Sequence, residues 1–513
     1  MFYQEKRDGF ARIGELEGIK TPTMVDYLKK DLDFIKKINF GKAPYAAKFV
    51  IELDKSLLPD GEIKILTGLS SLSPRELVRV FDEVRGKNPL YAVASATPKN
   101  VSLLIYLGAD MVDNILAISK AYNGIFFADE FEIPVAEAKG LCSCKYCDEL
   151  NFENVAKHNS EVLRKEVEKC RKLIEKEELR NYVESKVKID PELTATLRIS
   201  DFESEKSLFS RFKKSKCYFS SLESPYRFEV QNFLEKVVEC YEGKTKTLLI
   251  LPCTAKKPYF ISKTHRLIRE AVKVRVNEII VSSPLVVPRE FELIYPACNY
   301  DTPVTGYWSE EEIESVSYWL RRLVEKGKFE RVVAHVEGGY RKVVERALRD
   351  YEVHFTAEDG LLSERSLKNL NSKLEDEEYN FFDYILPQIS KYQFGIPFTA
   401  KTKGKYPELE FFRRDRVARI DTIYGMLDVY GEFAKELIAK KQYLVIIDNF
   451  IPKGTIFAAG IIEADEKIRP NDTVVFCSDE VYGVGIALMS GKEMVENDKG
   501  AAVKVKRVEK FKV

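Results

Sequence analysis

Hydrophobic residues along this chain form two alternating patterns: short unbroken apolar runs, and longer stretches with an apolar residue at every third or fourth position. Residues 46–53 and 63–66 are short runs, and residues 160–188 form a charged stretch of the second kind. Unbroken runs predict strands, and the wider spacing predicts amphipathic helices. Ser73 and Pro74 begin another helix, because serine is a favoured N-cap and proline fits the first helical turn. The N-terminal part therefore predicts the alternating strands and helices of a parallel sheet or barrel.

The same alternation returns in the middle of the chain, and a different pattern closes it. Residues 247–251, 278–282 and 331–336 are nearly continuous apolar runs, as expected for parallel strands that are buried on both faces. After a polar linker, short strands separated by turn residues predict a small β-barrel. We therefore predict a multidomain α/β fold with a small α+β segment before the barrel. Its four segments are residues 1–190, 191–360, 361–440 and 441–513.

Composition narrows the class of protein. The 513 residues include 81 basic and 81 acidic side chains, so the net charge is zero. Such a chain has no overall attraction to nucleic acid, and RNA binding must use local basic patches. The apolar runs are too short to cross a bilayer, and the first residues lack the apolar core of a signal peptide. Nine cysteines, an odd number, do not indicate a disulfide framework, so we expect a cytoplasmic protein with reduced thiols and no membrane contact.

Three cysteines and a histidine form the first candidate site. Cys142, Cys144 and Cys147 fall within six residues, and His158 follows at the start of a predicted helix. Three thiolates and one imidazole make a complete tetrahedral zinc set with no open position for chemistry. The spacing predicts a structural zinc ion that pins a loop to the helix. The alternative is a group of unligated thiols.

Another cysteine stands where a predicted strand ends. Pro252 closes the apolar run, Cys253 follows it, and lysines, a tyrosine, a serine and a histidine come soon after. Strand ends in α/β sheets are common sites for ligands, and a nearby lysine or histidine favours the reactive thiolate. This pattern predicts a nucleophilic cysteine. The alternative is that Cys253 is a small buried hydrophobic residue beside solvated lysines.

The residues around Cys253 resemble the motif of archaeosine synthases, which are archaeal tRNA-modifying enzymes. The matching positions are Pro252, Cys253, Lys257, Pro258, Tyr259, Ser262 and His265, and the similarity continues through residues 282–285, 288–290 and 300–306. The resemblance implies a tRNA substrate that carries 7-cyano-7-deazaguanine at position 15 of the D-loop. The enzyme would convert the nitrile of that base toward the amidine of archaeosine.

The motif residues can be given chemical roles under this resemblance. Cys253 would attack the nitrile carbon to form a thioimidate, and His265 would act as the acid and base. Lys257 would favour the thiolate or bind phosphate, while Tyr259 and Ser262 would orient these groups. The alternative is direct attack by the amine, with Cys253 only shaping the pocket.

The family uses either free lysine or glutamine as the nitrogen donor. We favour lysine, because the chain shows no separate glutaminase domain; a radical-SAM partner protein would then cleave the lysine adduct. Glu290, Asp301 and Glu337 are candidates for holding the α-amino group of the lysine, although each is more often a structural or solvated carboxylate. Ser282 and Ser283 complete the predicted substrate site. A homodimer is compatible with the sequence.

The cysteine cluster and an upstream stretch resemble tRNA-guanine transglycosylases. Asp113, within residues 108–114, occupies the position of that family's aspartate nucleophile. Fewer residues precede the cysteines than a complete (β/α)₈ barrel requires, and we find no segment that supplies a second catalytic aspartate. The resemblance implies a shortened barrel-type domain kept for binding or architecture. Two alternative functions stay open: an active transglycosylase that uses Asp113, and a non-catalytic tRNA-binding subunit.

Residues 443–448, 453–458, 468–475 and 484–491 form short apolar runs separated by glycine and other turn residues. In this pattern the C-terminal segment resembles a PUA domain, the pseudobarrel found in many RNA-modifying enzymes. Its glycines suit tight turns and close approach of the backbone. The alternative is a generic β-barrel without a role in RNA binding. The resemblance implies an RNA-facing surface that consists of Lys453, Gly454, Gly485, Lys492, Arg413 and Arg414.

Overall fold

The structure is a computed structural model that describes residues 2–29, 57–375 and 377–511. The strand predicted at residues 46–53 lies outside the described residues. The chain divides into two compact units. The first unit comprises Met1–Ser210, Ile446–Pro470 and Ile486–Val505. The second unit comprises Arg211–Val445, Asn471–Gly485 and Lys506–Val513.

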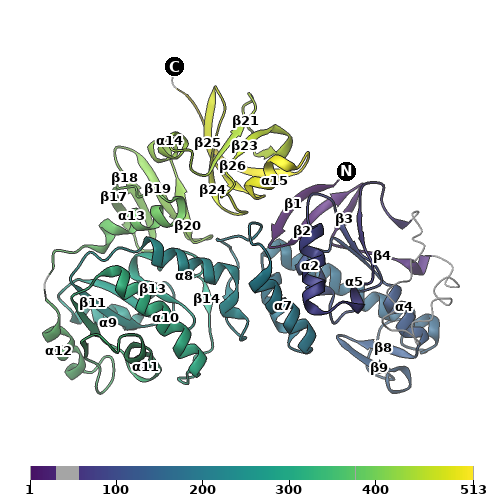
Figure 1. Ribbon diagram of the computed structural model, residues 1–513, viewed down its shortest axis with the longest axis horizontal. Coiled ribbons are helices and arrows are strands. Elements are labelled where there is room, and N and C mark those ends of the chain that lie inside the picture. The colour runs from purple at the N-terminus through teal and green to yellow at the C-terminus, as the bar shows by residue number, and fades with distance from the viewer. Residues whose placement is uncertain (1, 30–56, 376, 512–513) are drawn as a thin grey trace. The chain divides into compact units, whose positions relative to one another are not determined.

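The N-terminal part of the first unit contains an antiparallel and a parallel sheet (Figure 1). The antiparallel sheet has the order β1 (Tyr3–Asp8), β2 (Ala11–Leu16) and β3 (Ile19–Thr21). The parallel sheet has the order β4 (Thr23–Val25), β7 (Met111–Asp113), β6 (Leu90–Ala92) and β5 (Lys64–Leu66). Strand β5 confirms the prediction for residues 63–66. Within the described residues β4 and β5 are edge strands, so the predicted barrel is not confirmed.

Helices and a short hairpin complete this part of the first unit. They are α2 (Pro74–Val84), α3 (Val101–Leu107), α4 (Ile115–Tyr122), the hairpin β8 (Ile125–Ala128) and β9 (Phe131–Pro134), α5 (Phe152–Lys176), α6 (Leu179–Val187) and α7 (Pro191–Glu203). The predicted cap of α2 is confirmed, since the Ser73 hydroxyl accepts a hydrogen bond from the Glu76 N–H. The single helix predicted for residues 160–188 is wrong. It is divided at Glu177, whose φ of 63° is left-handed and ends α5.

The second unit is built on a five-stranded sheet. Its order is β13 (Val286–Pro288), β12 (Asn277–Val281), β11 (Thr247–Pro252), β15 (Arg331–Ala334) and β16 (Val353–Phe355). All neighbours are parallel except the edge strand β13, which runs antiparallel to β12. This sheet confirms the three strands predicted in the middle of the chain. Its helices are α8 (Phe228–Cys240), α9 (Lys263–Ala271), α10 (Glu310–Gly327), α11 (Gly338–Ala347) and α12 (Glu364–Lys373).

Strand β11 is the central strand, and all of its residues are buried. Leu249 and Leu251 pack with Ile268 of α9 and Val333 of β15 in one hydrophobic cluster. Burying a side chain of this kind contributes about 1.5–3 kcal/mol. The end of β11 therefore stands on a densely packed base.

Two further sheets follow along the chain. An antiparallel sheet has the order β17 (Lys401–Lys405), β18 (Glu408–Phe412), β19 (Arg416–Asp421) and β20 (Met426–Val429), with helices α13 (Phe381–Phe394) and α14 (Gly431–Ala439). The C-terminal sheet has the order β22 (Thr455–Phe457), β26 (Ala501–Lys510), β25 (Val481–Ala487), β24 (Thr473–Cys477), β21 (Leu444–Ile447) and β23 (Ile461–Ala464), with helix α15 (Gly491–Glu496). The short C-terminal strands predicted from the sequence are therefore present.

None of the described helices combines the length and the apolar character that crossing a bilayer requires.

Candidate functional sites

Cys253 lies directly after the central strand β11. Its N–H donates to the carbonyl of Val281, the last residue of the neighbouring strand β12, at 2.9 Å. Its Sγ lies 3.2 Å from the hydroxyl oxygen of Tyr340, which belongs to the first turn of α11. Burial, and then the neighbouring Cys253, raise the pKa of Tyr340, so its hydroxyl stays protonated and can donate to the sulfur. The partly buried thiol is therefore positioned by backbone and side-chain contacts.

Tyr340 was not assigned a role from the sequence. A signal was nevertheless present, because strands β11 and β15 are parallel neighbours and their carboxyl ends share one edge of the sheet. Tyr340 follows β15 as Cys253 follows β11. The rule that ligand sites form at this edge applies to both loops.

Lys257 lies four residues after Cys253 in the loop that follows β11. Its Nζ is 4.0 Å from the centre of the Tyr300 ring, a distance that fits a cation–π interaction. Burial lowers the pKa of Lys257, whereas the nearby Cys253 and Asp301 raise it. The ammonium is thus held beside the sulfur and over an aromatic face.

Three buried hydroxyl groups form a hydrogen-bonded network that includes the Tyr300 side chain. The Tyr300 hydroxyl is hydrogen-bonded to both the Tyr259 and the Ser282 hydroxyls, and all three side chains are buried. Burial raises the pKa of Tyr259 and Tyr300, so both phenols stay neutral. The structure therefore places Tyr259 and Ser282 in one network that fixes the Tyr300 ring under Lys257.

His265 is fully buried, and both of its ring nitrogens have partners. Its Nε2 donates to the Pro252 carbonyl at 2.8 Å, and its Nδ1 accepts from Arg289 at 2.8 Å. Burial, and then the Arg289 charge, lower the pKa of His265 to about 3. The imidazole is therefore neutral, and neither nitrogen is available to the Cys253 sulfur. This geometry does not support the predicted acid–base role.

Ser262 lies at the N-terminus of α9, the helix that carries His265. The Ser262 hydroxyl accepts from the His265 N–H at 3.3 Å and caps the helix. Serine is a preferred residue at such a position because its oxygen satisfies a free helical N–H. Ser262 thus fixes the start of the helix, and His265 in turn holds the carbonyl of the residue before Cys253.

The predicted substrate residues fall into two groups. Asp301 ends β14 (Tyr300–Asp301) and is exposed, with Lys216 at 3.4 Å, and Glu337 directly precedes α11. Both therefore lie close in sequence to residues of the Cys253 site. Ser283, in contrast, donates to Glu312 at 2.8 Å.

Glu290 lies elsewhere. Its carboxylate accepts from Asn277, the first residue of β12, at 2.9 Å, and from the Tyr379 hydroxyl. Cys253 is bonded to the other end of β12, roughly 13 Å away at about 3.3 Å per residue. Burial raises the pKa of Glu290 to about 7. The structure therefore does not bring Glu290 to Cys253.

The Cys142 cluster brings all of its predicted ligands together. One ligand atom from each of Cys142, Cys144, Cys147 and His158 lies within 4.8 Å of all the others. The His158 Nδ1 is 3.5 Å from the Cys144 sulfur and 3.4 Å from the Cys147 sulfur. Its Nε2 lies 2.9 Å from the Phe127 carbonyl, a contact that leaves Nδ1 for a metal. The residues can hold a metal ion, and three sulfurs with one nitrogen fit the donor set of tetrahedral zinc.

His158 was expected at the start of its helix. Helix α5 instead begins at Phe152 and is capped by Asn151, whose side chain accepts from the Asn154 N–H at 3.0 Å. His158 therefore lies on the second turn, and the ring of Phe126 stacks on it at 3.9 Å between centres. Both contacts hold the imidazole against the cysteine loop.

Asp113, the candidate nucleophile of the alternative function, is buried at the end of β7. Its carboxylate accepts from the Tyr91 hydroxyl at 2.9 Å, from the Ala94 N–H at 2.8 Å and from the Ile115 N–H at 3.0 Å. Burial raises the pKa of Asp113 to about 6. These bonds tie three segments of the domain together and describe a structural carboxylate.

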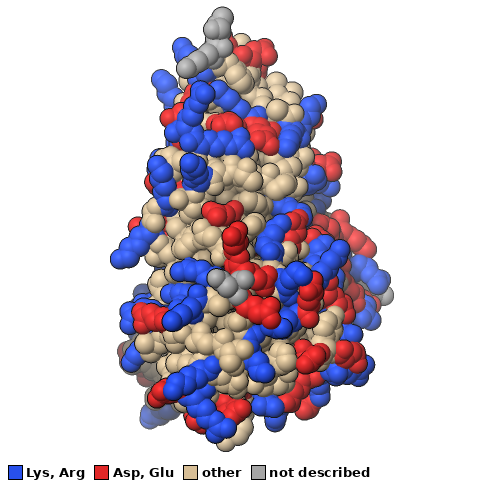
Figure 2. Space-filling model, turned by 90° about the vertical axis from the view of Figure 1, so that its left-hand side faces the viewer, with Lys and Arg blue, Asp and Glu red and all other residues tan. Residues whose placement is uncertain are grey.

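The predicted RNA-facing residues differ in accessibility. Lys453, Gly454, Lys492 and Arg414 are exposed, whereas Gly485 is buried within β25. Arg413 is ion-paired with Glu432, and Lys492 lies 3.7 Å from Glu496. Figure 2 shows Lys and Arg side chains among Asp and Glu side chains on one face, in line with the net charge of zero.

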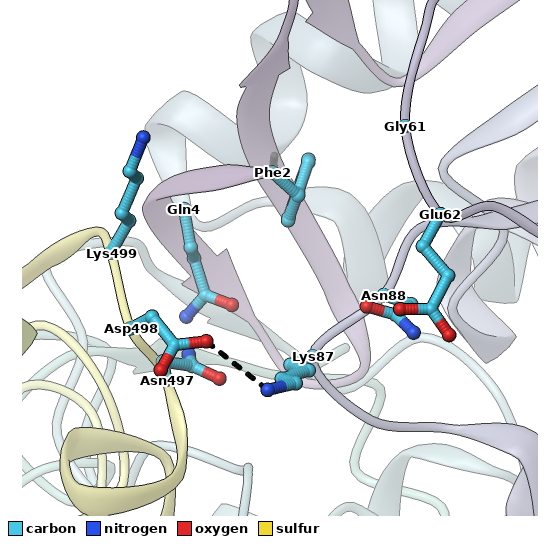
Figure 3. Close-up of a pocket in the computed structure, with 9 residues that line it drawn as sticks. All are labelled: Phe2, Gln4, Gly61, Glu62, Lys87, Asn88, Asn497, Asp498 and Lys499. Carbon is cyan, nitrogen blue, oxygen red and sulfur yellow. Dashed lines mark hydrogen bonds and ion pairs between the residues drawn. The ribbon is translucent and has the colours of Figure 1, made fainter.

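A separate pocket of about 310 Å³ lies in the first unit (Figure 3). A 3.1 Å ion pair between Lys87 and Asp498 lies at this pocket, and Phe2, Gln4 and Asn88 also line it. None of the residues that the sequence singled out lines this pocket.

Family models match three consecutive parts of the chain. One family, described only as a domain of unknown function, matches residues 230–374. A pre-PUA domain matches residues 379–438, and a PUA domain matches residues 446–508. Fold and domains together define a multidomain α/β protein with a C-terminal PUA domain.

Relatives over nearly the whole chain identify the family. The archaeosine synthase subunit alpha of Methanosarcina acetivorans is 34% identical, and the match covers 89% of this chain and 82% of the relative. The archaeosine synthase of Haloferax volcanii is 34% identical over 81% of this chain and 76% of the relative. This chain belongs to the archaeosine synthase family, which confirms the resemblance noted in the sequence.

Two further similarities are weaker or shorter. The tRNA-guanine(15) transglycosylase of Methanobrevibacter smithii is 23% identical over 89% of this chain and 72% of its own length. The crystal structure of a protein of unknown function is 50% identical and matches with a TM-score of 0.50, covering 54% of this chain and 99% of that chain.

Proposed function

We propose that this protein is a tRNA-modifying enzyme of archaeosine synthesis. Its substrate is tRNA that carries 7-cyano-7-deazaguanine, and it adds an amine to the nitrile of that base to give an amidine. The observation that carries the proposal is the position of Cys253, at the end of the central strand with the Tyr340 hydroxyl 3.2 Å from its sulfur. The names of the relatives over most of the chain support the tRNA substrate.

The proposed reaction begins with attack of the Cys253 thiolate on the nitrile carbon. The new S–C bond uses the sulfur lone pair, one π bond of the nitrile moves to nitrogen, and a proton gives the neutral thioimidate. The Tyr340 hydroxyl holds the sulfur before attack, and the Lys257 ammonium supplies positive charge near the nitrogen that becomes basic. Positive charge placed where negative charge develops stabilises the transition state.

The second half of the reaction releases the enzyme. The neutral amine attacks the thioimidate carbon, the C–S bond breaks, and the sulfur leaves as the Cys253 thiolate. The proton of the amine stays on the product, which is the protonated amidine on the base. We propose free lysine as the amine and glutamine as the alternative. We propose that Asp301 and Glu337, which lie close in sequence to residues of the Cys253 site, hold its α-amino group. A radical-SAM partner would cleave the lysine adduct in a later reaction.

His265 has a positioning role in this proposal. Its neutral imidazole donates to the Pro252 carbonyl and accepts from Arg289, so it fixes the turn on which Cys253 stands. A residue with both nitrogens engaged moves no proton to the substrate. The proton therefore comes from Lys257, Tyr340 or water.

The rest of the chain serves binding and stability. The Cys142 cluster holds a structural zinc ion, and the exposed Lys453, Gly454, Lys492 and Arg414 contact RNA phosphates. We keep the division into segments 1–190, 191–360, 361–440 and 441–513 as a proposal for the functional domains.

Mass spectrometry of the tRNA tests this function. The purified protein is incubated with tRNA that carries the nitrile base, together with lysine or glutamine. The proposal expects the modified nucleoside to gain the mass of one lysine, and expects no gain with Cys253→Ala. An unchanged nucleoside with both amines would contradict the proposed function, and a released base would favour the transglycosylase alternative.

A further inference from the structure

The loop between β14 and α10 exposes apolar side chains beside the Cys253 site. Tyr307 is 89% exposed and Val304 is 76% exposed, the two highest values among the large hydrophobic side chains of the described residues. Water contact with such surface is unfavourable, and exposed aromatic residues next to a site commonly mark a place where a partner binds. The exposed ring of Tyr307 therefore indicates a surface that binds another molecule.

The loop is built to hold Tyr307 in place. The Thr305 hydroxyl accepts from the Tyr307 N–H at 3.2 Å and donates to the Tyr307 carbonyl at 3.1 Å. Gly306 between them has a φ of 77°, which is left-handed and suits glycine. The backbone on both sides of the tyrosine is therefore fixed while its ring stays free.

A chain of contacts joins this loop to the reactive thiol. The ring of Trp308 packs edge-on against Tyr340, with 5.0 Å between centres, and the Tyr340 hydroxyl is 3.2 Å from the Cys253 sulfur. Gly339 makes this packing close, because a Cβ there would meet the Trp308 ring at 2.1 Å. Tyr307 thus directly precedes Trp308, whose ring packs against the Tyr340 side chain of the Cys253 site.

The charges around the thiol indicate which partner the loop receives. Lys256 is exposed and has no ion pair within the described parts of the chain, and it lies three residues after Cys253 on the same loop as Lys257. Lysines that attract phosphate and an exposed aromatic ring for stacking are the elements with which proteins hold unpaired nucleotides. A protein partner would need a wider apolar surface than the exposed Tyr307 and Val304 side chains of this loop provide.

We propose that Tyr307 is a stacking platform for an RNA base next to the modified base. A base inside a duplex cannot reach an enzymic nucleophile, so its strand must be unstacked, and an aromatic ring replaces the stacking that the neighbouring base loses. Lys256 binds the phosphate of the same nucleotide. This inference rests on the proposed function, because it names how the tRNA is presented to Cys253.

Binding of tRNA by full-length variants tests the platform. Tyr307→Ala is expected to weaken affinity for nitrile-bearing tRNA about 5- to 100-fold, the range implied by the loss of one base–aromatic stack. Tyr307→Phe keeps the ring and is expected to bind within about twofold of the wild type. Tyr318→Ala is the matched control, since Tyr318 is 55% exposed and lies eight residues into α10, roughly 12 Å along the helix.

A fluorescent base separates stacking from a general loss of affinity. With 2-aminopurine beside the modified position, wild type and Tyr307→Phe should quench the emission on binding, and Tyr307→Ala should not. The inference would be overturned if Tyr307→Ala bound tRNA as tightly as the wild type and quenched the emission equally, with an unchanged melting temperature. This outcome applies only if the wild type modifies tRNA. The inference would also be overturned if Tyr307→Ala lost a protein that copurifies with the wild type but still bound tRNA normally. Failure of the wild type to modify tRNA is instead a failure of the proposed function.

Discussion

Cysteine and histidine occur together in two regions of this protein, and they meet in only one of them. In the Cys142 cluster the His158 Nδ1 lies 3.4 Å from the Cys147 sulfur. In the second region His265 follows Cys253 by twelve residues, but both of its nitrogens are bound to Pro252 and Arg289. Cysteine and histidine thus form an arrangement that can bind a metal in the first region. In the second region the histidine holds the turn that carries the cysteine. Nearness in sequence did not decide which contacts form.

The largest effect that sharpens this comparison is expected at Cys253. Cys253→Ala should reduce turnover by at least about 10³-fold, because a covalent nucleophile acts in the transition state. Affinity for tRNA and the melting temperature should stay close to wild type, since the side chain is small and only partly buried. Single-turnover rates and tRNA binding, measured on the same preparation, check both parts. Turnover within tenfold of wild type would leave direct attack by the amine as the mechanism.

The opposite outcome is expected for the metal cluster. Cys144→Ser should remove the zinc, and the loss of a structural metal costs more than about 3 kcal/mol. Each kcal/mol lowers the melting temperature of a domain of this size by about 2–4 °C. Metal analysis should find about one zinc in the wild type and none in the variant, with any lost activity explained by unfolding. A wild type that is fully stable without metal would rule out the structural zinc.

His265 gives a smaller effect, and pH separates its two possible roles. His265→Gln leaves buried hydrogen-bonding groups at Pro252 and Arg289 imperfectly paired, which costs about 1–3 kcal/mol of stability. Because the pKa of His265 is lowered to about 3, the imidazole does not titrate between pH 5 and 8 in the folded protein. The pH–rate profiles of wild type and variant should therefore have the same shape. An inflection between pH 5 and 8 that disappears in the variant would restore the acid–base role.

The same lowered pKa has a consequence for stability. Unfolded histidine titrates near pH 6.5, so between about pH 6.5 and 3 the unfolded state binds the extra proton. The contribution of His265 to stability is complete above that window and is lost as the pH falls through it. Chemical denaturation at several pH values should show a shallower loss for His265→Gln than for wild type.

Tyr340 should give an effect that is confined to the rate and leaves stability close to that of the wild type. Tyr340→Phe removes one hydrogen bond to the reacting sulfur, and bonds to charged groups are worth about 1.5–3 kcal/mol, or roughly 10- to 150-fold in rate. We expect kcat to fall while KM for tRNA changes little, and alkylation of Cys253 by iodoacetamide to slow. Unchanged kcat and alkylation would show that the 3.2 Å contact has no role in the chemistry.

How much of this could be predicted depends on the range of the contacts. The Cys142 cluster could be predicted because a tight spacing of thiols leaves few geometries, and the strand before Cys253 because a buried parallel strand is apolar throughout. The contact with Tyr340 joins residues 87 positions apart and depends on the order of strands in the sheet. The break in the predicted helix 160–188 occurs at a non-glycine residue in a left-handed conformation, which local propensity does not reveal.

A search for a covalent adduct on Cys253 tests the central claim most directly. The protein is incubated with nitrile-bearing tRNA in the absence of any amine, digested with ribonuclease and protease, and analysed by peptide mass spectrometry, with Cys253→Ala as the control. The account predicts a thioimidate of the modified nucleotide on the peptide that contains Cys253, and its disappearance when lysine is added. Turnover with lysine but no adduct on Cys253 in its absence would contradict covalent catalysis.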